Sequence, residues 1–239
     1  MKTKFAHVKD IDIAYKVLGK GYPLIMIMGY LGAMECWDKK TLRFLSRHYK
    51  VVIFDNRGMG ETSASDKEFS IGLFADDISG LMKALNIKKA NILGWSMGSN
   101  IAIEFALKYP GKINKLVLYA ADCGGSKFIH TNPRRMSKKK LYFSKYILKL
   151  RYCGSQENID RQTKAVEEWK GAYFKLARIK ARTLVITGMD DILVLPANSS
   201  LIAKKIKNSW LVQIKDAGHG IMYQYPKGFS SIVHTFLQA

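Results

Sequence analysis

Cysteine is scarce in this chain, which has three: Cys36, Cys123 and Cys153. None of them forms a C-x-x-C pair, and an odd, sparse set argues against a disulfide framework and is typical of a reducing compartment. No cluster of histidine and cysteine has the spacing of a metal site. A lysine-bearing phosphate loop and a complete dinucleotide fingerprint are also missing. We therefore expect neither a metal nor a cofactor.

Long apolar runs are missing as well. No run approaches the roughly 18 residues that a membrane-spanning helix needs. The first residues, MKTKFAHVKDIDIAYKV, carry scattered charges and contain no apolar stretch of the kind found in a signal peptide. These absences predict a cytoplasmic protein that does not insert into membranes.

Acidic residues are few compared with basic ones. Lys and Arg number 39 against 19 Asp and Glu, which gives a net charge of +20. Between residues 125 and 180, fifteen basic residues face four acids. Such an excess attracts anionic partners over long distances. The basic positions lack the compact arginine-and-aromatic pattern of a nucleic-acid reader, so we expect a solvated lysine surface and no specific nucleic-acid partner.

The chain does contain regularly spaced short apolar runs. Lys4 to Val8 and Ile11 to Leu18 alternate apolar and polar residues, which predicts a hairpin that turns near Lys9 and Asp10. Six further runs are almost continuously apolar, as in strands of a parallel sheet that is covered on both faces. They are residues 24–28, 51–55, 91–93, 115–120, 183–188 and 210–215.

Helical stretches separate these runs. They cover residues 37–47, 71–85, 97–109, 196–206 and 225–237. Alternation of strand and helix predicts an α/β fold with a mostly parallel, doubly wound sheet of about eight strands.

The alternation is interrupted once, between residues 122 and 180. The segment contains no convincing strand, but two stretches are helical in character, KKKLYFSKYILKLRY and AVEEWKGAYFKLARI. A structureless loop of that length would be unusual in a compact domain. We interpret it as a basic helical lid over the carboxyl edge of the sheet, where open α/β sheets bind ligands. The core then comprises residues 1–121 and 181–239.

A serine lies between two glycines in NILGWSMGSN, where an apolar run ends and a helical stretch begins. Glycine is favoured where the backbone turns sharply or approaches other atoms closely. Gly94 and Gly98 flank Ser96 symmetrically. A serine hydroxyl becomes a good nucleophile only when a base takes its proton and a third group orients that base.

A base and an acid follow later in the chain. Among five histidines, only His219 lies in a glycine-flanked loop directly after a predicted strand, in DAGHGIMYQYP. The stretch VITGMDDILVLP places Asp190 and Asp191 after the preceding strand. Serine, acid and histidine in this order, with the serine on a strand-to-helix turn, are typical of one hydrolase fold.

Four motifs carry a resemblance that covers nearly the whole chain. GWSMG resembles the nucleophile elbow of the α/β-hydrolase superfamily, and FDNRGMGETS resembles the D-x-R-G-x-G-x-S loop after its fourth strand. TGMDDILVLP resembles its acid loop, and GHG its histidine loop. A lone G-x-S-x-G is a weak signal, but four motifs in order after predicted strands are specific. The sequence is similar to single-domain esterases and lactonases with a short lid.

The resemblance implies a role for particular residues. The family places its acid three residues after a glycine, which selects Asp191 and leaves Asp190 as a loop or capping residue. Asp122 fits a second acid position that some relatives use. In the family, oxyanion-hole donors are the backbone N–H after the nucleophile, here Met97, and one that follows a His-Gly pair. This chain has Met28-Gly29 instead, which leaves Tyr30 as the second donor.

The resulting hypothesis is a serine hydrolase that cleaves small to medium carboxylic esters or lactones through an acyl-enzyme on Ser96. His219 acts as the base, Asp191 orients it, and no cofactor takes part. A subset of apolar residues is predicted to line the acyl pocket: Leu31, Trp37, Trp95, Leu193 and Met222. Asp55 and Arg57 are expected to pin the loop beneath the site.

Several alternatives share this apparatus or this fold. They are an acyltransferase or thioesterase, a carbon–carbon bond hydrolase, an aminopeptidase, and a ligand receptor without turnover. The expected partner is a small ester-like molecule, and the basic lid predicts a preference for anionic substrates. The chain is expected to be a monomer or a homodimer.

Overall fold

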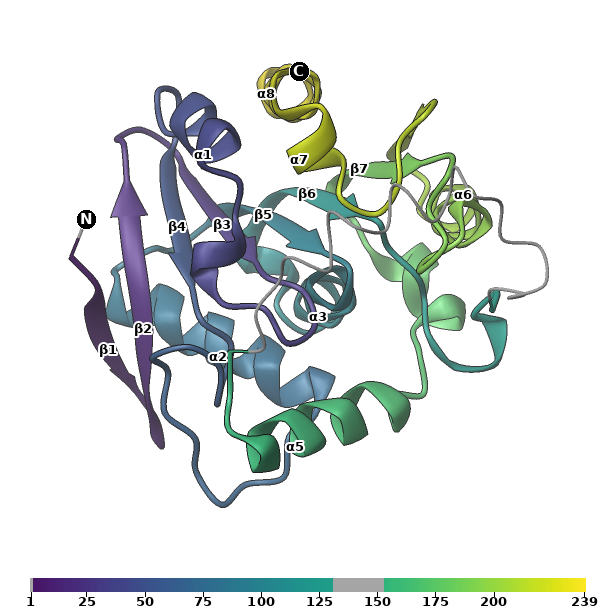
Figure 1. Cartoon of the computed structure of the whole chain (residues 1–239). Helices are drawn as coiled ribbons and strands as arrows, with labels where there is room; N and C mark the ends of the chain where they lie inside the picture. The colour runs from purple at the N-terminus through teal and green to yellow at the C-terminus, as the bar shows by residue number, and fades with distance from the viewer. Residues whose placement is uncertain (1, 131–152) are drawn as a thin grey trace.

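The computed structural model describes residues 2–130 and 153–239, and a single eight-stranded sheet runs through them (Figure 1). Its strands lie in the order β1-β2-β4-β3-β5-β6-β7-β8. They are β1 (Lys4–Val8), β2 (Ile11–Leu18), β3 (Pro23–Ile27), β4 (Lys50–Phe54), β5 (Ala90–Trp95), β6 (Ile113–Tyr119), β7 (Arg182–Gly188) and β8 (Ser209–Ile214).

Only the first two pairings are antiparallel. β1 pairs with β2 and β2 with β4 in that sense, whereas β4, β3, β5, β6, β7 and β8 run parallel. The carboxyl ends of parallel strands meet at one edge of a sheet. The loops that follow β3, β5, β7 and β8 therefore all open at this edge. The predicted α/β fold with a mostly parallel sheet is confirmed.

Helices cover both faces of the sheet (Figure 1). One apolar core contains buried residues of α2 (Ile71–Ala84), α3 (Met97–Lys108) and α6 (Pro196–Lys205). The other contains those of α1 (Lys39–Leu45), α7 (Ile221–Gln224) and α8 (Pro226–Gln238). In β3, Ile25 and Ile27 belong to the first core, and Leu24 and Met26 to the second. A strand between two cores needs apolar residues on both faces, which explains the unbroken apolar runs.

The ends of the sheet differ from its centre. The predicted hairpin is confirmed, with β1 and β2 at the predicted residues. β8 lies at the opposite edge and is not buried on both faces, since Trp210 and Leu211 are 43% and 39% exposed. An edge strand has a neighbour on one side only, so its apolar residues do not imply full burial. The short helix α7 was not predicted.

Between β6 and β7, the described residues contain α5 (Gln156–Glu167) and the 3₁₀ turns η3 (Gly125–Lys127) and η5 (Tyr173–Arg178), but no strand. The predicted helical stretch at residues 138–152 lies outside the described residues. The stretch that begins at Ala165 is not one continuous helix: α5 ends at Glu167, Gly171 adopts a φ of +78° between the two pieces, and the 3₁₀ helix η5 follows. A Cβ on Gly171 would lie 2.5 Å from the Cys123 carbonyl oxygen.

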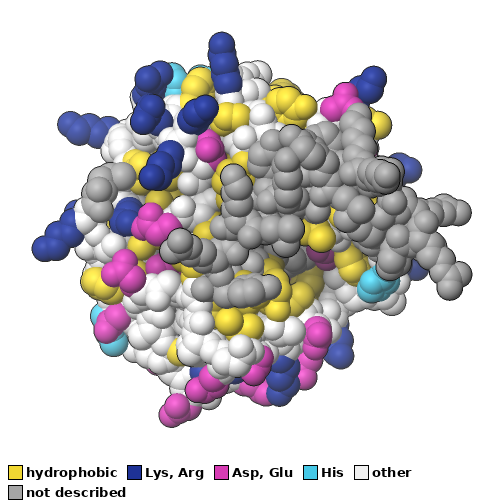
Figure 2. Space-filling model, viewed as in Figure 1, with side chains coloured by type: hydrophobic (Ala, Val, Ile, Leu, Met, Phe, Trp, Pro, Cys, Tyr) yellow, Lys and Arg dark blue, Asp and Glu magenta, His cyan; other side chains and the backbone are white. Residues whose placement is uncertain are grey.

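The charges are unevenly distributed over the molecule. Figure 2 shows Lys and Arg gathered over the α1 side of this face, while Asp and Glu are frequent along the α5 side. α5 itself carries three acids, Glu157, Asp160 and Glu167, against Arg161 and Lys164. The basic excess of residues 125–180 therefore lies outside α5. In the described residues, no helix is both long and apolar enough to cross a membrane.

Candidate active site

Ser96 occupies a strained turn between β5 and α3. Its φ of 55° and ψ of −125° lie outside the regions that non-glycine residues ordinarily adopt. The flanking glycines explain how the turn is so tight. A Cβ on Gly94 would lie 2.2 Å from the Gly98 carbonyl oxygen, and one on Gly98 would lie 2.2 Å from the Ile27 carbonyl oxygen. Strain of this kind is typically kept at functional sites.

His219 and Asp191 form a buried pair. His219 Nδ1 lies 2.8 Å from Asp191 Oδ2, and the two side chains are 5% and 0% exposed. The other oxygen of Asp191 accepts the backbone N–H groups of Leu193 and Val194 at 2.9 and 3.0 Å. With both oxygens bonded, the carboxylate is fixed in orientation. It therefore holds the imidazole with Nδ1 toward the acid and leaves Nε2 for another partner.

The backbone of His219 is anchored from below. Its carbonyl oxygen accepts the Trp95 indole N–H at 3.1 Å and the Tyr119 hydroxyl at 2.6 Å. The two rings stack on each other with centroids 5.8 Å apart. Trp95 directly precedes Ser96, so these bonds attach the histidine loop to the serine turn. Tyr119 was not singled out from the sequence, and its place at the end of a central strand was the only available signal.

The loop after β3 lies against Ser96. A Cβ on Gly29 would lie 3.2 Å from the Ser96 Cβ and 3.9 Å from its Oγ, which brings the Tyr30 backbone beside the serine. Met97 is the first residue of α3, and the first N–H groups of a helix have no partner within it. The two predicted oxyanion donors therefore belong to segments that flank the serine hydroxyl.

The loop after β4 supports the loop after β3. Asp55 Oδ1 accepts the Met34 N–H at 2.6 Å, and Asn56 donates to the Met28 carbonyl oxygen at 3.0 Å. Burial raises the pKa of Asp55, and its bonds to backbone N–H groups oppose that shift. The motif FDNRGMGETS thus acts as a brace beneath the serine, because its buried side chains bind backbone groups of the neighbouring loop.

Arg57 belongs to the same brace. Its guanidinium is fully buried and bonds Asp77 at 2.9 and 2.7 Å and Asp10 at 2.6 and 3.3 Å. The bond to Arg57 lowers the pKa of Asp10 far below its usual range. The fifth donor bonds the Ser65 hydroxyl at 2.9 Å, so no N–H of this guanidinium is free for a substrate. This geometry agrees with the predicted pinning role.

The other candidate acids bind elsewhere. Asp122 Oδ1 accepts the Gly124 N–H at 2.8 Å and the Asn100 amide at 3.1 Å. Burial raises the pKa of Asp122, and the charge of His219 is among the influences that oppose this shift. Asp190 is partly exposed, and its backbone N–H bonds the Ala217 carbonyl oxygen at 2.8 Å. The acid on His219 Nδ1 is therefore Asp191.

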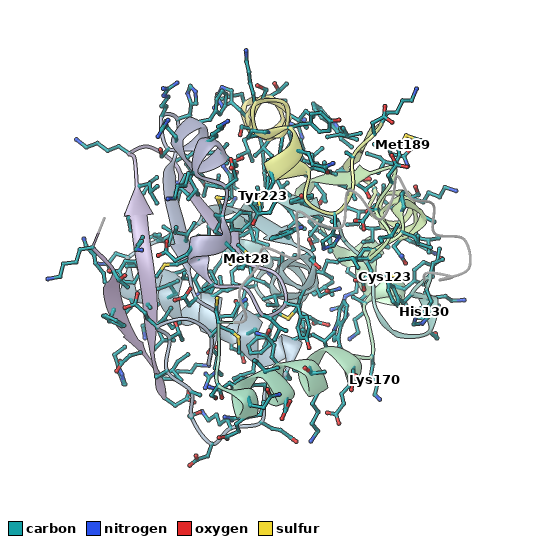
Figure 3. The ribbon with its side chains drawn as sticks, in the orientation of Figure 1. Met28, Cys123, His130, Lys170, Met189 and Tyr223 are labelled. Atoms are coloured by element: carbon teal, nitrogen blue, oxygen red, sulfur yellow. The ribbon has the colours of Figure 1, made fainter. Side chains whose placement is uncertain are left out.

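In the described structure, the Ser96 hydroxyl and the His219 ring are not hydrogen-bonded to each other. Catalytic hydrogen bonds are often long before a substrate is bound. The other histidines named below either pack against another ring or lie far from the centre of the molecule. His48 and His234 stack with centroids 4.2 Å apart, and Figure 3 places His130 at the periphery, away from Met28 near the centre.

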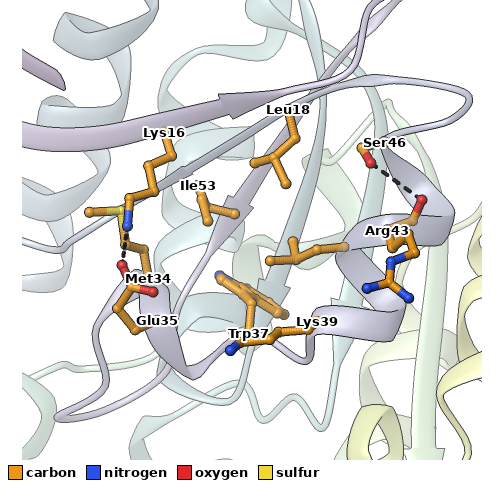
Figure 4. A pocket seen from close by; sticks show the side chains of 10 residues that line it. Lys16, Leu18, Met34, Glu35, Trp37, Lys39, Arg43, Ser46 and Ile53 are labelled. Carbon is orange, nitrogen blue, oxygen red and sulfur yellow. Dashed lines mark hydrogen bonds and ion pairs between the residues drawn. The ribbon is translucent and has the colours of Figure 1, made fainter. Parts of the chain in front are cut away.

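The residues expected to line an acyl pocket lie in different environments. Leu193 is 46% exposed, whereas Leu31, Trp95 and Met222 are buried. Trp37 is also buried and lines a separate cavity of about 470 Å³ under α1 (Figure 4). Neither Ser96 nor His219 lines this cavity. Its lining comprises Lys16, Leu18, Met34, Glu35, Trp37, Lys39, Leu42, Arg43, Ser46 and Ile53.

Metal ligands do not gather in the described part of the chain. No group of three or more His, Cys, Asp or Glu side chains is placed there to hold a metal ion. Cys123 is buried, and burial raises the pKa of its thiol to about 11. Its thiol is therefore protonated near neutral pH, and Cys123 acts as a packing residue. The candidates for catalysis at this edge of the described structure are Ser96, His219 and Asp191.

Comparison with known proteins bears on the whole fold. The family model for the alpha/beta hydrolase fold matches residues 22–152, which is more than half of the chain. The chain belongs to the alpha/beta hydrolase fold family. This hydrolase is 29% identical to the serine hydrolase BPHL of Homo sapiens over 97% of the chain and 84% of that protein.

Two further likenesses have the same extent. The 2-hydroxy-6-oxo-6-phenylhexa-2,4-dienoate hydrolase of Comamonas testosteroni is 25% identical over 99% of this chain and 96% of that protein. An esterase from Thermogutta terrifontis superposes with a TM-score of 0.86 at 21% identity, over 100% of this chain and 98% of that one. The second likeness concerns the fold alone. Both likenesses extend over almost the full length of each chain.

Proposed function

We propose that this hydrolase cleaves small to medium carboxylic esters or lactones through an acyl-enzyme on Ser96. The observation that carries the proposal is the buried His219–Asp191 pair, which is tied through Trp95 to the strained Ser96 turn. A histidine fixed through Nδ1 presents Nε2 as a base. A serine on a strained turn presents its hydroxyl at the carboxyl edge of the sheet.

The reaction proceeds in two halves. Ser96 Oγ attacks the carbonyl carbon while its proton passes to His219 Nε2, and Asp191 stabilises the imidazolium that forms. The N–H groups of Met97 and Tyr30 bind the negatively charged oxygen. His219 then gives its proton to the departing alkoxide. Water, activated by the same imidazole, releases the acid from Ser96.

Hydrolysis of a series of p-nitrophenyl esters, from acetate to long acyl chains, tests this mechanism. We expect turnover by the wild type, its loss in Ser96→Ala, and a chain-length optimum that sizes the acyl pocket. Labelling of Ser96 by a fluorophosphonate provides a second readout. A wild type that neither hydrolyses any ester nor is labelled would contradict the proposal.

A carbon–carbon bond hydrolase is the second candidate. It is supported by the likeness to the Comamonas testosteroni dienoate hydrolase along almost the full length of both chains. The same serine, histidine and acid would serve either reaction. Turnover of a vinylogous 1,5-diketone, followed by loss of its visible absorbance, with no turnover of esters of similar size would favour this candidate.

The predicted lid and the preference for anionic substrates are parts of the same proposal. The insertion between β6 and β7 approaches the site through α5, whose Gln162 bonds the backbone of Leu31. Matched neutral and carboxylate-bearing esters should differ in kcat/KM at low salt, and added salt should reduce the difference. Equal kcat/KM values would remove the anionic preference and leave ester hydrolysis intact.

A further inference from the structure

Leu31 has an unusual backbone conformation in the loop that carries Tyr30. Its φ of +59° lies in the left-handed region, which a branched side chain rarely adopts. Such a conformation persists only when the surrounding structure holds it. Both hydrogen-bonding groups of Leu31 are held by the α5 segment, which we define as residues 153–168. Its N–H donates to Gln162 Oε1 at 2.7 Å, and its carbonyl oxygen accepts the Cys153 N–H at 3.3 Å.

Gln162 is an unusual residue within α5. Of the twelve residues of this helix, only Gln162 and Ala165 are buried, and Gln162 is 0% exposed. Burying a side-chain amide is unfavourable unless it is hydrogen-bonded. Because its Oε1 accepts from Leu31, the amide orientation is fixed. Its Nε2 finds no acceptor among the described residues. Among the described residues, the bond to Leu31 is therefore the hydrogen bond that offsets the burial of this amide.

The helix that carries Gln162 is itself attached to neighbouring segments by side-chain contacts. The Arg161 guanidinium donates to the carbonyl oxygens of Ser65 and Lys67 at 2.5 and 2.6 Å, and it lies 4.1 Å from the Phe69 ring centroid. Beside Gln162, the Thr163 hydroxyl lies 2.5 Å from the Tyr30 hydroxyl. The helix is thus attached both to the loop after β4 and to Tyr30 itself.

We propose that Gln162 is a positioning residue of the oxyanion hole. It holds Leu31 in the left-handed conformation and fixes the Tyr30–Leu31 peptide, whose N–H it binds. With that peptide fixed, the Tyr30 backbone is held on its C-terminal side, and the N–H of the Gly29–Tyr30 peptide is kept directed toward the oxyanion. Without the bond, Leu31 relaxes to negative φ, and that rotation turns the adjoining peptides. The geometry of the oxyanion hole then depends on the contact between the α5 segment and Leu31. This inference rests on the proposed serine-hydrolase function.

The variant Gln162→Met tests the proposal, with Gln156→Met as its matched control. Gln156 lies on the same helix, is exposed and bonds only Asp160 among the described residues. Losing a complete oxyanion donor lowers kcat by about 10²- to 10³-fold, and a displaced donor should cost about tenfold. We expect Gln162→Met to lower kcat about tenfold with little change in KM, and Gln156→Met to behave as the wild type.

A second readout separates positioning from general stability. An alkylboronic acid forms a tetrahedral adduct on the serine and occupies the oxyanion hole, so its affinity should fall by the same factor as kcat. Wild-type kcat and boronate affinity in Gln162→Met, with Ser96→Ala still inactive, would overturn the inference and leave the function standing.

Amide hydrogen exchange tests the contact without any substrate. The Leu31 N–H should exchange at least about tenfold faster in Gln162→Met than in the wild type, under conditions where both are folded. An unchanged exchange rate would overturn the inference even if no ester proved to be a substrate. Failure of the proposed function and failure of this inference are therefore distinguishable.

Discussion

At the scale of single residues, His219 is held at three points. Asp191 bonds its Nδ1, while Trp95 and Tyr119 bond its backbone carbonyl oxygen. The side-chain contact fixes the tautomer, and the backbone contacts fix where the ring lies relative to Ser96. An acid in this position stabilises the imidazolium without itself taking a proton. Removing its charge while keeping its shape should therefore affect rate far more than stability.

Asp191→Asn should lower kcat by about 10³- to 10⁴-fold, because an amide can hold the wrong imidazole tautomer and brings no negative charge. Asp190→Asn provides the control, since this neighbour bonds through its backbone N–H. Ester hydrolysis and urea unfolding should be measured on both variants. Equal losses of kcat in Asp191→Asn and Asp190→Asn would contradict the assignment of Asp191. If Asp191→Asn keeps activity and Asp122→Asn abolishes it, the acid is Asp122.

At the scale of elements, the site depends on how closely β5, α3 and β3 approach one another. Gly94 and Gly98 are the two positions where this approach leaves no room for a side chain. The G-x-S-x-G motif is therefore a packing requirement of the strand-to-helix turn as much as a catalytic signature. It allows the N-terminus of α3 to lie against the end of β3 and brings the Met97 and Tyr30 backbones to one serine.

Gly98→Ala should be strongly destabilising, by about 3 kcal/mol or more, because its Cβ would lie 2.2 Å from the Ile27 carbonyl oxygen. Gly111→Ala is a matched control, since a Cβ there has no atom within 4 Å. A compatible Gly-to-Ala change stabilises by about 0.4–1 kcal/mol. Urea unfolding measures both. Similar stabilities for the two variants would contradict the packing argument.

The contact between α1 and α8 contains a titratable group. His234 on α8 stacks on His48, and its Nδ1 lies 2.9 Å from the Tyr49 hydroxyl. Burial, with a smaller contribution from His48, lowers the pKa of His234 below its ordinary value of 6.5. The unfolded chain therefore binds this proton at a higher pH than the folded protein does. The contribution of His234 to the free energy of unfolding is therefore fully present above about pH 6.5, and it is lost as the pH falls below that value.

His234→Gln should consequently weaken the pH dependence of folding. The loss in the free energy of unfolding between about pH 7.5 and about pH 5.5 should be smaller in this variant than in the wild type. His7→Gln is the control, because His7 is exposed on β1 and lies outside this contact. Urea unfolding at both pH values gives the comparison. An identical pH dependence in His234→Gln and the wild type would contradict the assignment.

At the scale of the whole molecule, the dominant feature is the net charge of +20. Like charges over a compact surface repel one another and destabilise the folded state. Exposed ion pairs such as Lys164–Glu68 offset little of this, because surface pairs contribute about 0–1 kcal/mol each. Salt screens the repulsion, with a Debye length of about 10 Å at 0.1 M.

The melting temperature should therefore rise between about 20 mM and about 200 mM sodium chloride. For a chain of this size, each kcal/mol of relief raises Tm by about 2–4 °C. Calorimetry over that range measures the effect, and a neutral osmolyte at equal osmolality serves as the control. A melting temperature that falls with salt would show that attractive pairs outweigh the net repulsion.

The sequence by itself determined the order of strands and helices, the serine turn and the histidine loop. These features are local: apolar runs define strands, and the steric needs of a tight turn select glycine at positions 94 and 98. The resemblance to the family then favoured Asp191 over Asp190, and in the structure Asp191 Oδ2 lies 2.8 Å from His219 Nδ1.

Only the tertiary structure decided what holds these groups in place. The bond from Tyr119 to His219 joins residues 100 positions apart, and that from Leu31 to Gln162 joins residues 131 positions apart. No local pattern marks a tyrosine or glutamine for such a role, because the partner is brought close only when the sheet is assembled. The exposure of β8 was decided in the same way, since an edge is defined by the neighbour that is missing.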